Sequence, residues 1–259
     1  MATPTGVPSR SDEPVSVRAM EPSIKTLRPA TLAAALLITV FASATAEAQT
    51  AREVARESFP SVVTIIAKQP NGKTVSLGSG FFVEPGMIAT AYHVVKGASA
   101  LFAKGMSQRQ LFRVRLVAVD TKTDLALLGR PSEPRIPPFS EFEAILDLRS
   151  LPLGDSSAVE VGEEVYAVGN PEGLEGTFSQ GIVSGIRRVG DRDLIQITAP
   201  ISHGSSGGPV LNRQGQVIGV AVGAIRTGQN LNFAIPASRL RSLVDEMQSK
   251  TGWGRLILK

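Results

Sequence analysis

Residues 201–210 read ISHGSSGGPV and place two adjacent serines, Ser205 and Ser206, between glycines. A serine hydroxyl is a weak nucleophile that needs a base beside it. The run fits the G-x-S-x-G turn of α/β-hydrolases, the nucleophile turn of another class of serine hydrolase, or a Gly/Ser loop without chemistry. The histidines and carboxylates elsewhere in the chain must decide among these interpretations.

The chain has two histidines, His93 and His203, and their positions limit the order of a catalytic triad. The α/β-hydrolase order ends in histidine, but no histidine follows Ser206. The subtilisin order, Asp-His-Ser, would have to use Asp12, which lies in a segment predicted to be removed. The order that remains is His, Asp, Ser, as in chymotrypsin-like barrels.

Local context indicates which residues could complete that order. His93 lies near the end of the predicted strand at 87–95, and Asp124 leads into an apolar run, so the Asp124 carboxylate should be partly buried and need a partner. Asp120 is the rival carboxylate, but it stands with Lys122 in a polar turn. Each residue taken singly would be interpreted as structural, whereas all three in one permitted order favour catalysis.

Composition limits the class of protein. The 259 residues are 42% apolar, which is enough for a core, and the net charge of +4 comes without a basic run. Nucleic-acid binding is therefore not predicted. The absence of cysteine excludes disulfides, zinc–thiolate sites and thiol catalysis. Serine chemistry requires no metal or organic cofactor, and none is predicted.

The periodicity predicts two groups of short strands, rich in β-branched and aromatic residues, around a proline-rich linker at 131–144. Gly190-Asp191 predicts a hairpin turn in the second group. Two such groups indicate two barrels side by side. Helices are predicted at 50–59 and 238–250. The strands are predicted at 61–68, 74–83, 87–95, 111–120 and 124–130, then at 163–171, 176–188, 193–199, 207–212, 216–225 and 231–237.

The N-terminus has the pattern of an export signal. A charged leader precedes an apolar run at 29–48 that ends in AEA, which predicts cleavage after Ala48 and a mature start at Gln49. Met20 is an alternative start, because MEPSIKTLRPA makes an ordinary leader. An uncleaved membrane anchor is less favoured, since the run is short and contains four hydroxyl residues. The protein is expected to be exported, to a bacterial periplasm or beyond it.

The motifs GMIATAYHVV, DTKTDLALL, YAVGNPEGL, SQGIVSGI, APISHGSSGGPVLN and LNFAIPASRL resemble the protease domain of HtrA/Deg serine proteases, in the trypsin-like superfamily. The resemblance runs from about 55 to 250. It implies an all-β fold of two six-stranded antiparallel barrels, at about 60–130 and 151–237. It also implies that His93 is the general base, Asp124 its orienting carboxylate and Ser206 the nucleophile.

The resemblance further implies that the backbone N–H groups of Gly204 and Ser206 form an oxyanion hole. Two departures from the family pattern stand out. The chain ends at Lys259 without the PDZ domain that usually follows, and Ser205 replaces the usual asparagine before the nucleophile. Family members commonly form homotrimers through their N-terminal segments. The resemblance to these proteases also implies that the substrates are unfolded or extended polypeptides.

The specificity pocket is expected to have Pro200 at its base, six residues before the nucleophile, with Ile201 beside it. Ala224 and Ile225 should form the opposite wall. No carboxylate is available there to pair with Arg or Lys, so a narrow apolar pocket for small aliphatic side chains is predicted. His203 is expected to be a rim residue of this pocket, and a catalytic role for it is the less favoured alternative.

Two alternatives to an active protease remain open from the sequence. The same fold could serve as a non-catalytic module that binds extended chains as an added strand. An enzyme whose oxyanion turn is disordered until activated would have the same sequence, because backbone orientation makes the hole. The complete triad favours the enzyme.

The export signal gives the first testable prediction. N-terminal sequencing of the exported protein should find a mature chain that begins at Gln49, because the small residues before it suit signal cleavage. A mature protein that begins at residue 1 or at Met20 and stays in the cytoplasm would contradict the predicted localisation.

Overall fold

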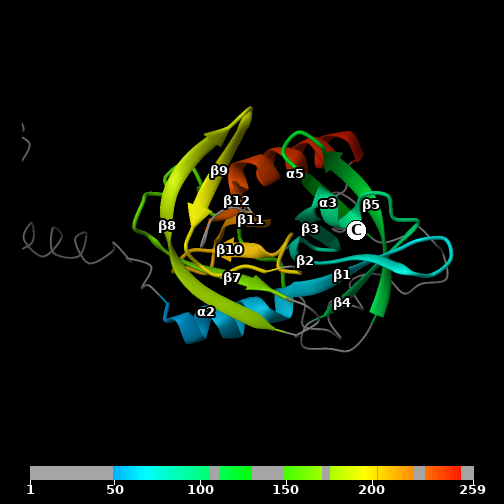
Figure 1. Ribbon diagram of the computed structural model, residues 1–259, viewed down its shortest axis with the longest axis horizontal. Coiled ribbons are helices and arrows are strands. Elements are labelled where there is room, and N and C mark those ends of the chain that lie inside the picture. The colour runs from blue at the N-terminus through cyan, green and yellow to red at the C-terminus, as the bar shows by residue number, and fades with distance from the viewer. Residues whose placement is uncertain are drawn as a thin grey trace, which may run out of the picture. The chain divides into compact units, whose positions relative to one another are not determined.

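The computed structural model describes residues 49–105, 111–129, 149–170, 176–202, 204–224 and 231–251. Within these ranges the chain forms twelve strands, β1–β12, which close into two antiparallel barrels (Figure 1). The predicted signal segment 1–48 and the predicted linker at 131–144 lie outside the described residues. None of the helices in the described ranges is both long and apolar enough to span a bilayer.

The first barrel closes in the strand order β1-β2-β3-β6-β5-β4, with every neighbouring pair antiparallel. A short helix, α3 (Tyr92–Val95), follows β3 and carries His93. The strands are β1 (Val62–Lys68), β2 (Thr74–Glu84), β3 (Met87–Ala91), β4 (Ala100–Gly105), β5 (Leu111–Asp120) and β6 (Leu125–Gly129).

The second barrel closes in the order β10-β11-β12-β9-β8-β7, again antiparallel throughout. Gly190, with φ +61°, occupies the tight turn between β8 and β9, as the sequence predicts. The strands are β7 (Glu164–Gly169), β8 (Thr177–Val189), β9 (Arg192–Ile197), β10 (Pro209–Leu211), β11 (Val217–Ala224) and β12 (Asn232–Pro236).

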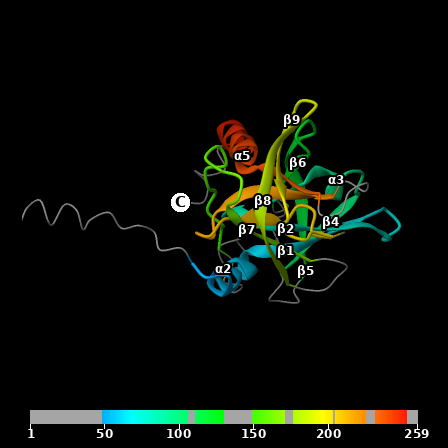
Figure 2. The ribbon, with the colours of Figure 1, turned by 60° about the vertical axis from the view of Figure 1, so that its left-hand side comes forward.

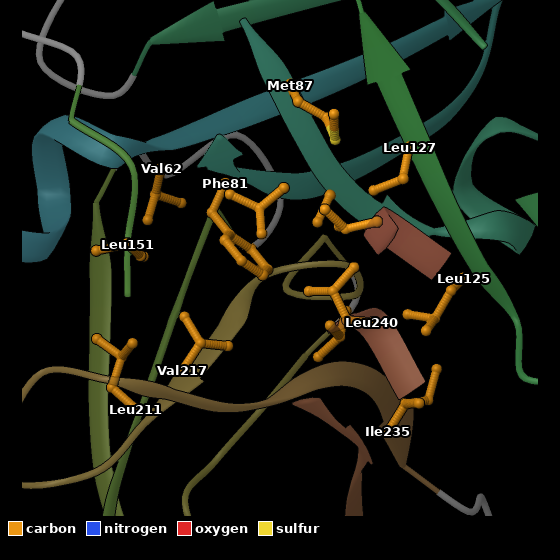
Figure 3. Packing of buried hydrophobic residues seen from close by; sticks show 14 of the residues in the cluster. Val62, Phe81, Met87, Leu125, Leu127, Leu151, Leu211, Val217, Ile235 and Leu240 are labelled. Carbon is orange, nitrogen blue, oxygen red and sulfur yellow. The ribbon is translucent and has the colours of Figure 1, made fainter. Parts of the chain in front are cut away.

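Buried apolar side chains form three clusters: one inside each barrel and one between them. Because alternate residues of a strand face opposite sides, each barrel fills its interior and still presents apolar residues to its neighbour. Figure 3 shows the cluster between the barrels, where side chains from both barrels and from the C-terminal helix converge. It includes Val62, Phe81, Leu125, Leu127, Leu211, Val217, Ile235 and Leu240.

Two longer helices lie on opposite sides of the barrels (Figures 1 and 2). The N-terminal helix α2 (Ala51–Ser58) begins with a capping box in which Thr50 and Glu53 satisfy each other's backbone N–H groups, and it ends before Pro60. The C-terminal helix α5 (Ala237–Thr251) contacts β5 of the first barrel and both β11 and β12 of the second. The buried face of α5 therefore packs against both barrels and stabilises their arrangement.

The predicted all-β fold of two six-stranded barrels with flanking helices is confirmed, but two local predictions are wrong. No strand was predicted at β4, whose Ala, Lys and Gly residues are poor strand formers. The predicted strand at 87–95 is too long, because residues 92–95 form α3. There, Val94 and Val95 turn into the core of the first barrel and leave His93 exposed, so packing overrides β-propensity.

Candidate active site

His93 and Asp124 are brought together by the pairing of β3 with β6. Ala91, at the end of β3, pairs with Leu125, at the start of β6, so the residues beyond these two positions are neighbours. The backbone N–H of Tyr92 donates to the carbonyl of Asp124 (2.9 Å). The backbone N–H of His93 donates to Asp124 Oδ1 (2.8 Å), and His93 Nδ1 lies 2.6 Å from Asp124 Oδ2.

This contact fixes the tautomer of the imidazole. A carboxylate can only accept, so His93 Nδ1 carries a proton, and in the neutral imidazole it is Nε2 that has the lone pair. The imidazole side chain is 45% exposed and the Asp124 side chain only 18% exposed. The sheltered carboxylate can therefore orient a base that remains accessible to a reactant.

Asp124 adopts a left-handed backbone conformation, with φ +64°, and is the one non-glycine residue in the described ranges that does so. Aspartate tolerates this conformation better than most residues, yet it still costs free energy. The strain is held in place by the three hydrogen bonds that Asp124 accepts from the Tyr92–His93 segment. Backbone strain of this kind is common at functional sites.

Asp120, the rival carboxylate, accepts hydrogen bonds only from residues of its own turn within the described ranges. It accepts hydrogen bonds from the backbone N–H groups of Lys122 (2.9 Å) and Thr123 (3.2 Å) and from Thr123 Oγ1 (2.6 Å). Partial burial alone would raise the pKa of Asp120, but these hydrogen bonds outweigh it and hold the pKa below its usual value. The structure therefore brings Asp124, and not Asp120, to His93.

The serine-containing turn follows Ser202 and packs closely against the first barrel. Gly207 has φ +86°, and a Cβ there would lie 2.3 Å from both the carbonyl oxygen of Ser79 and Thr90 Oγ1. The Gly207 N–H donates to the carbonyl of Ala221 (2.7 Å). Only glycine has both the backbone freedom and the small size that this position requires.

The two serines of the turn differ in environment. Ser205 is buried and packs against Gly169, where an added Cβ would lie 2.9 Å from Ser205 Cα. Ser206 is half-buried, and a Cβ at Gly223 would lie 3.6 Å from its Oγ. Ser206 is therefore the serine that a reactant can reach.

Neighbouring contacts bring the serine turn close to the helix that carries His93. A Cβ at Gly78 would meet the side chain of Val94 at 2.6 Å and the carbonyl of Ser206 at 3.0 Å. No hydrogen bond joins the Ser206 hydroxyl to His93 in the part of the chain that the structure describes. Such bonds are often long in unliganded sites and tighten when substrate binds.

Two backbone N–H groups of the turn donate no hydrogen bond to another described residue. Within the described ranges, neither the Gly204 N–H nor the Ser206 N–H has an acceptor, whereas the N–H groups of Ser205, Gly207 and Gly208 all do. Gly204 has φ +98°, which favours glycine. Free, fixed N–H groups beside a serine can stabilise a developing oxyanion.

The predicted pocket is described in part. Pro200 is exposed and Ile201 half-buried, while Ala224 is the last residue of β11. His203 and Ile225 lie outside the described residues. A cavity of about 850 Å³ elsewhere on the second barrel, lined by residues at 155–164, 180–182 and 212–218 among others, contains none of the predicted site residues.

Asn232, which the sequence did not single out, contacts one expected wall residue, Ala224, and the residue just before another, Pro200. It pairs with Ala224 across β11 and β12, and its Nδ2 donates to the carbonyl of Ala199 (2.9 Å), just before Pro200. Its side chain is buried. The available signal was one amide residue at the start of an otherwise apolar strand, since buried polar groups require partners.

The two-barrel fold, with a histidine–aspartate pair on one barrel and a glycine-rich serine turn on the other, defines a chymotrypsin-like protein. Residues 78–220 match the trypsin-like peptidase domain family, and the chain belongs to this family. The resemblance to HtrA/Deg proteases is confirmed by its relatives. One is a probable periplasmic serine endoprotease, DegP-like, of Rickettsia conorii, 38% identical over 198 residues. Another is the chloroplastic Protease Do-like 1 of Arabidopsis thaliana, 32% identical over 213 residues.

Solved structures agree with these relatives. The serine endoprotease from Yersinia pestis has 26% identity and a TM-score of 0.64, covering 77% of this chain and 66% of that one. The HtrA-type protease AlgW with a tripeptide has 25% identity and a TM-score of 0.65, covering 76% of this chain and 63% of that one. The Rickettsia and Arabidopsis alignments cover 71% and 74% of this chain but only 36% and 46% of the relatives' own lengths.

The His93–Asp124 contact can be tested without measuring activity. The proton on His93 Nδ1 should give a far-downfield proton NMR signal, because a short hydrogen bond to a carboxylate deshields it. Asp124→Ala should abolish the signal, and Asp120→Ala, which removes the rival carboxylate, should leave it. Persistence of the signal in Asp124→Ala would show that another group holds the imidazole.

Proposed function

We propose that the chain is a serine endopeptidase in which His93 is the general base, Asp124 orients it and Ser206 is the nucleophile. The observation that carries the proposal is the His93–Asp124 pair, joined at 2.6 Å, with the His93 side chain 45% exposed. The family supports the same activity, since the relatives are named serine endoproteases.

The geometry supports acyl transfer through a covalent intermediate. His93 Nε2 takes the proton of the Ser206 hydroxyl as Oγ attacks the peptide carbonyl, and Asp124 stabilises the imidazolium that forms. The N–H groups of Gly204 and Ser206 bind the oxyanion of the tetrahedral intermediate. His93 then gives its proton to the leaving amine as the C–N bond breaks. Water attacks the acyl-enzyme while His93 takes its proton, and His93 returns that proton to Ser206 Oγ as the acid product leaves. No step needs a cofactor.

The substrates under this proposal are unfolded or extended polypeptides of exported proteins, because an extended chain can present its backbone to a site formed by residues of both barrels. Relatives are named periplasmic, which supports export of this chain too. Pro200 and Ile201 on one side, and Ala224 and Ile225 on the other, would form the pocket for the residue before the cut, with His203 at its rim. Assembly as a homotrimer stays a prediction.

Exchange of each serine for alanine separates the two candidates for the nucleophile. Ser206→Ala should lower casein hydrolysis by about 10⁴–10⁶-fold, because losing a triad nucleophile removes the covalent route. Ser205→Ala should retain much of the activity, since Ser205 is buried beside Gly169.

Each outcome of this comparison has a distinct meaning. If Ser205→Ala were the inactive variant, the nucleophile would be assigned to the wrong serine. If the unmodified chain bound denatured casein and never cut it, the chain would be a binding module on a protease fold.

The proposed pocket predicts where the enzyme cuts. Mass spectrometry of denatured casein digests should show cuts after Val, Ala or Ile, with modest selectivity, because one methylene changes discrimination by about 1–3 kcal/mol. Leaving a lysine or arginine cation without a carboxylate partner in an apolar pocket is costly. A majority of cuts after Arg or Lys would contradict the proposed pocket.

A further inference from the structure

We infer that Ser79, on β2 of the first barrel, is a positioning residue for the nucleophile turn of the second barrel. Its hydroxyl holds the peptide groups around Ser206 in the orientation that acyl transfer requires. This inference rests on the proposed protease activity and adds a residue to it that the triad and the oxyanion hole do not include.

Every polar group of Ser79 has a partner, and two of these bonds reach the turn. Its N–H donates to the carbonyl of Ser206 (2.8 Å), and its hydroxyl donates to the carbonyl of Gly204 (2.7 Å). The hydroxyl also accepts from the N–H of Asn170 (2.9 Å), and the Ser79 carbonyl accepts from Thr90 Oγ1 (2.6 Å). Ser79 is fully buried, so its hydroxyl cannot touch a substrate.

These bonds fix three consecutive peptide groups. The carbonyls of Gly204 and Ser206 are held by Ser79, and the carbonyl of Ser205, between them, accepts from the N–H of Gly208 (3.0 Å). The Ser206 N–H belongs to that middle peptide, whose plane is therefore set from both sides. This N–H is one of the two donors in the described turn that stay free for an oxyanion.

Loss of the hydroxyl alone would loosen this arrangement. Ser79→Ala keeps the backbone bond to Ser206 but leaves the Gly204 carbonyl and the N–H of the buried Asn170 without their partner. A part-buried carbonyl that loses its donor is destabilised, so the Gly204–Ser205 peptide would tend to rotate toward another donor. The rotation would change the direction of the adjoining Ser206 N–H and lower transition-state stabilisation without altering the pocket.

Thr64 provides a matched control at the same interface. It lies opposite Ser79 in the register of β1 and β2, is buried, and accepts a hydrogen bond from the Asn170 side-chain amide. Its hydroxyl makes no bond to the serine turn within the described ranges. Thr64→Val therefore removes one buried inter-barrel hydrogen bond and leaves the three peptide groups of the turn in place.

The experiment compares kcat and KM of the full chain and its variants on a fluorogenic peptide that carries a casein cleavage sequence. Ser79→Ala should lower kcat by about 10- to 100-fold, less than the loss of an oxyanion donor itself, with KM changed by less than about twofold. Ser79→Cys, which keeps the size and a weak S–H donor, should fall between the two. Thr64→Val should keep the unmodified kcat.

The melting temperature of each variant separates positioning from folding. If Ser79→Ala fails to fold, the intermediate kcat of Ser79→Cys still tests the inference. The inference is wrong if kcat is unchanged in both Ser79 variants, if Thr64→Val loses as much kcat, or if KM rises in proportion to the loss. These outcomes differ from failure of the proposed function, in which the unmodified chain itself cuts no peptide.

Discussion

The close approach of Gly207 to β2 and β3 is the contact on which the rest of the site depends. A single additional carbon at this position would overlap the carbonyl oxygen of Ser79 and the hydroxyl of Thr90, both at 2.3 Å. The glycine lets the serine turn of the second barrel lie directly on the first barrel. The residue before it, Ser206, is thereby placed near the segment that carries His93, although the two are 113 positions apart in the chain (206 − 93).

The two halves of the site are held by different kinds of structure. The His93–Asp124 pair depends on one local strand pairing, β3 with β6, and on the strained backbone of Asp124. The serine turn depends on contacts between the two barrels. The apolar cluster shared by both barrels and α5 holds the barrels in the arrangement that these contacts require. Interiors this closely packed transmit small displacements, so buried residues far from the reacting atoms can affect the chemistry.

Much of the fold could be predicted from sequence, since runs of β-branched residues indicate strands and Gly, Pro and Asp pairs between them indicate turns. The hairpin at Gly190 is an example. β4 could not be found in this way, because its sequence ALFAKG has a low β-propensity. The strand is instead stabilised by pairing with both β1 and β5. Residues 92–95 look like a strand by composition, and only the packing of Val94 and Val95 makes them helical.

The proposed order of His93, Asp124 and Ser206 could be derived from the sequence because few residues could supply the chemistry. The preference for Asp124 over Asp120 followed from its apolar context, and the hydrogen bonds of both residues agree with it. Ser79 and Asn170 were not predictable, and the only signal for Asn232 was one amide at the start of an otherwise apolar strand. Each is a single polar residue whose partner is remote in sequence, as with the 125 positions between Ser79 and Gly204.

The most direct test of the central claim, a His93-activated Ser206, is covalent labelling with a serine-directed phosphonate and peptide mass mapping of the adduct. The account predicts one adduct, on Ser206, and loss of labelling in His93→Ala, because the hydroxyl needs its base to become nucleophilic. An adduct on Ser205, or labelling of Ser206 that is equally fast without His93, would contradict the account.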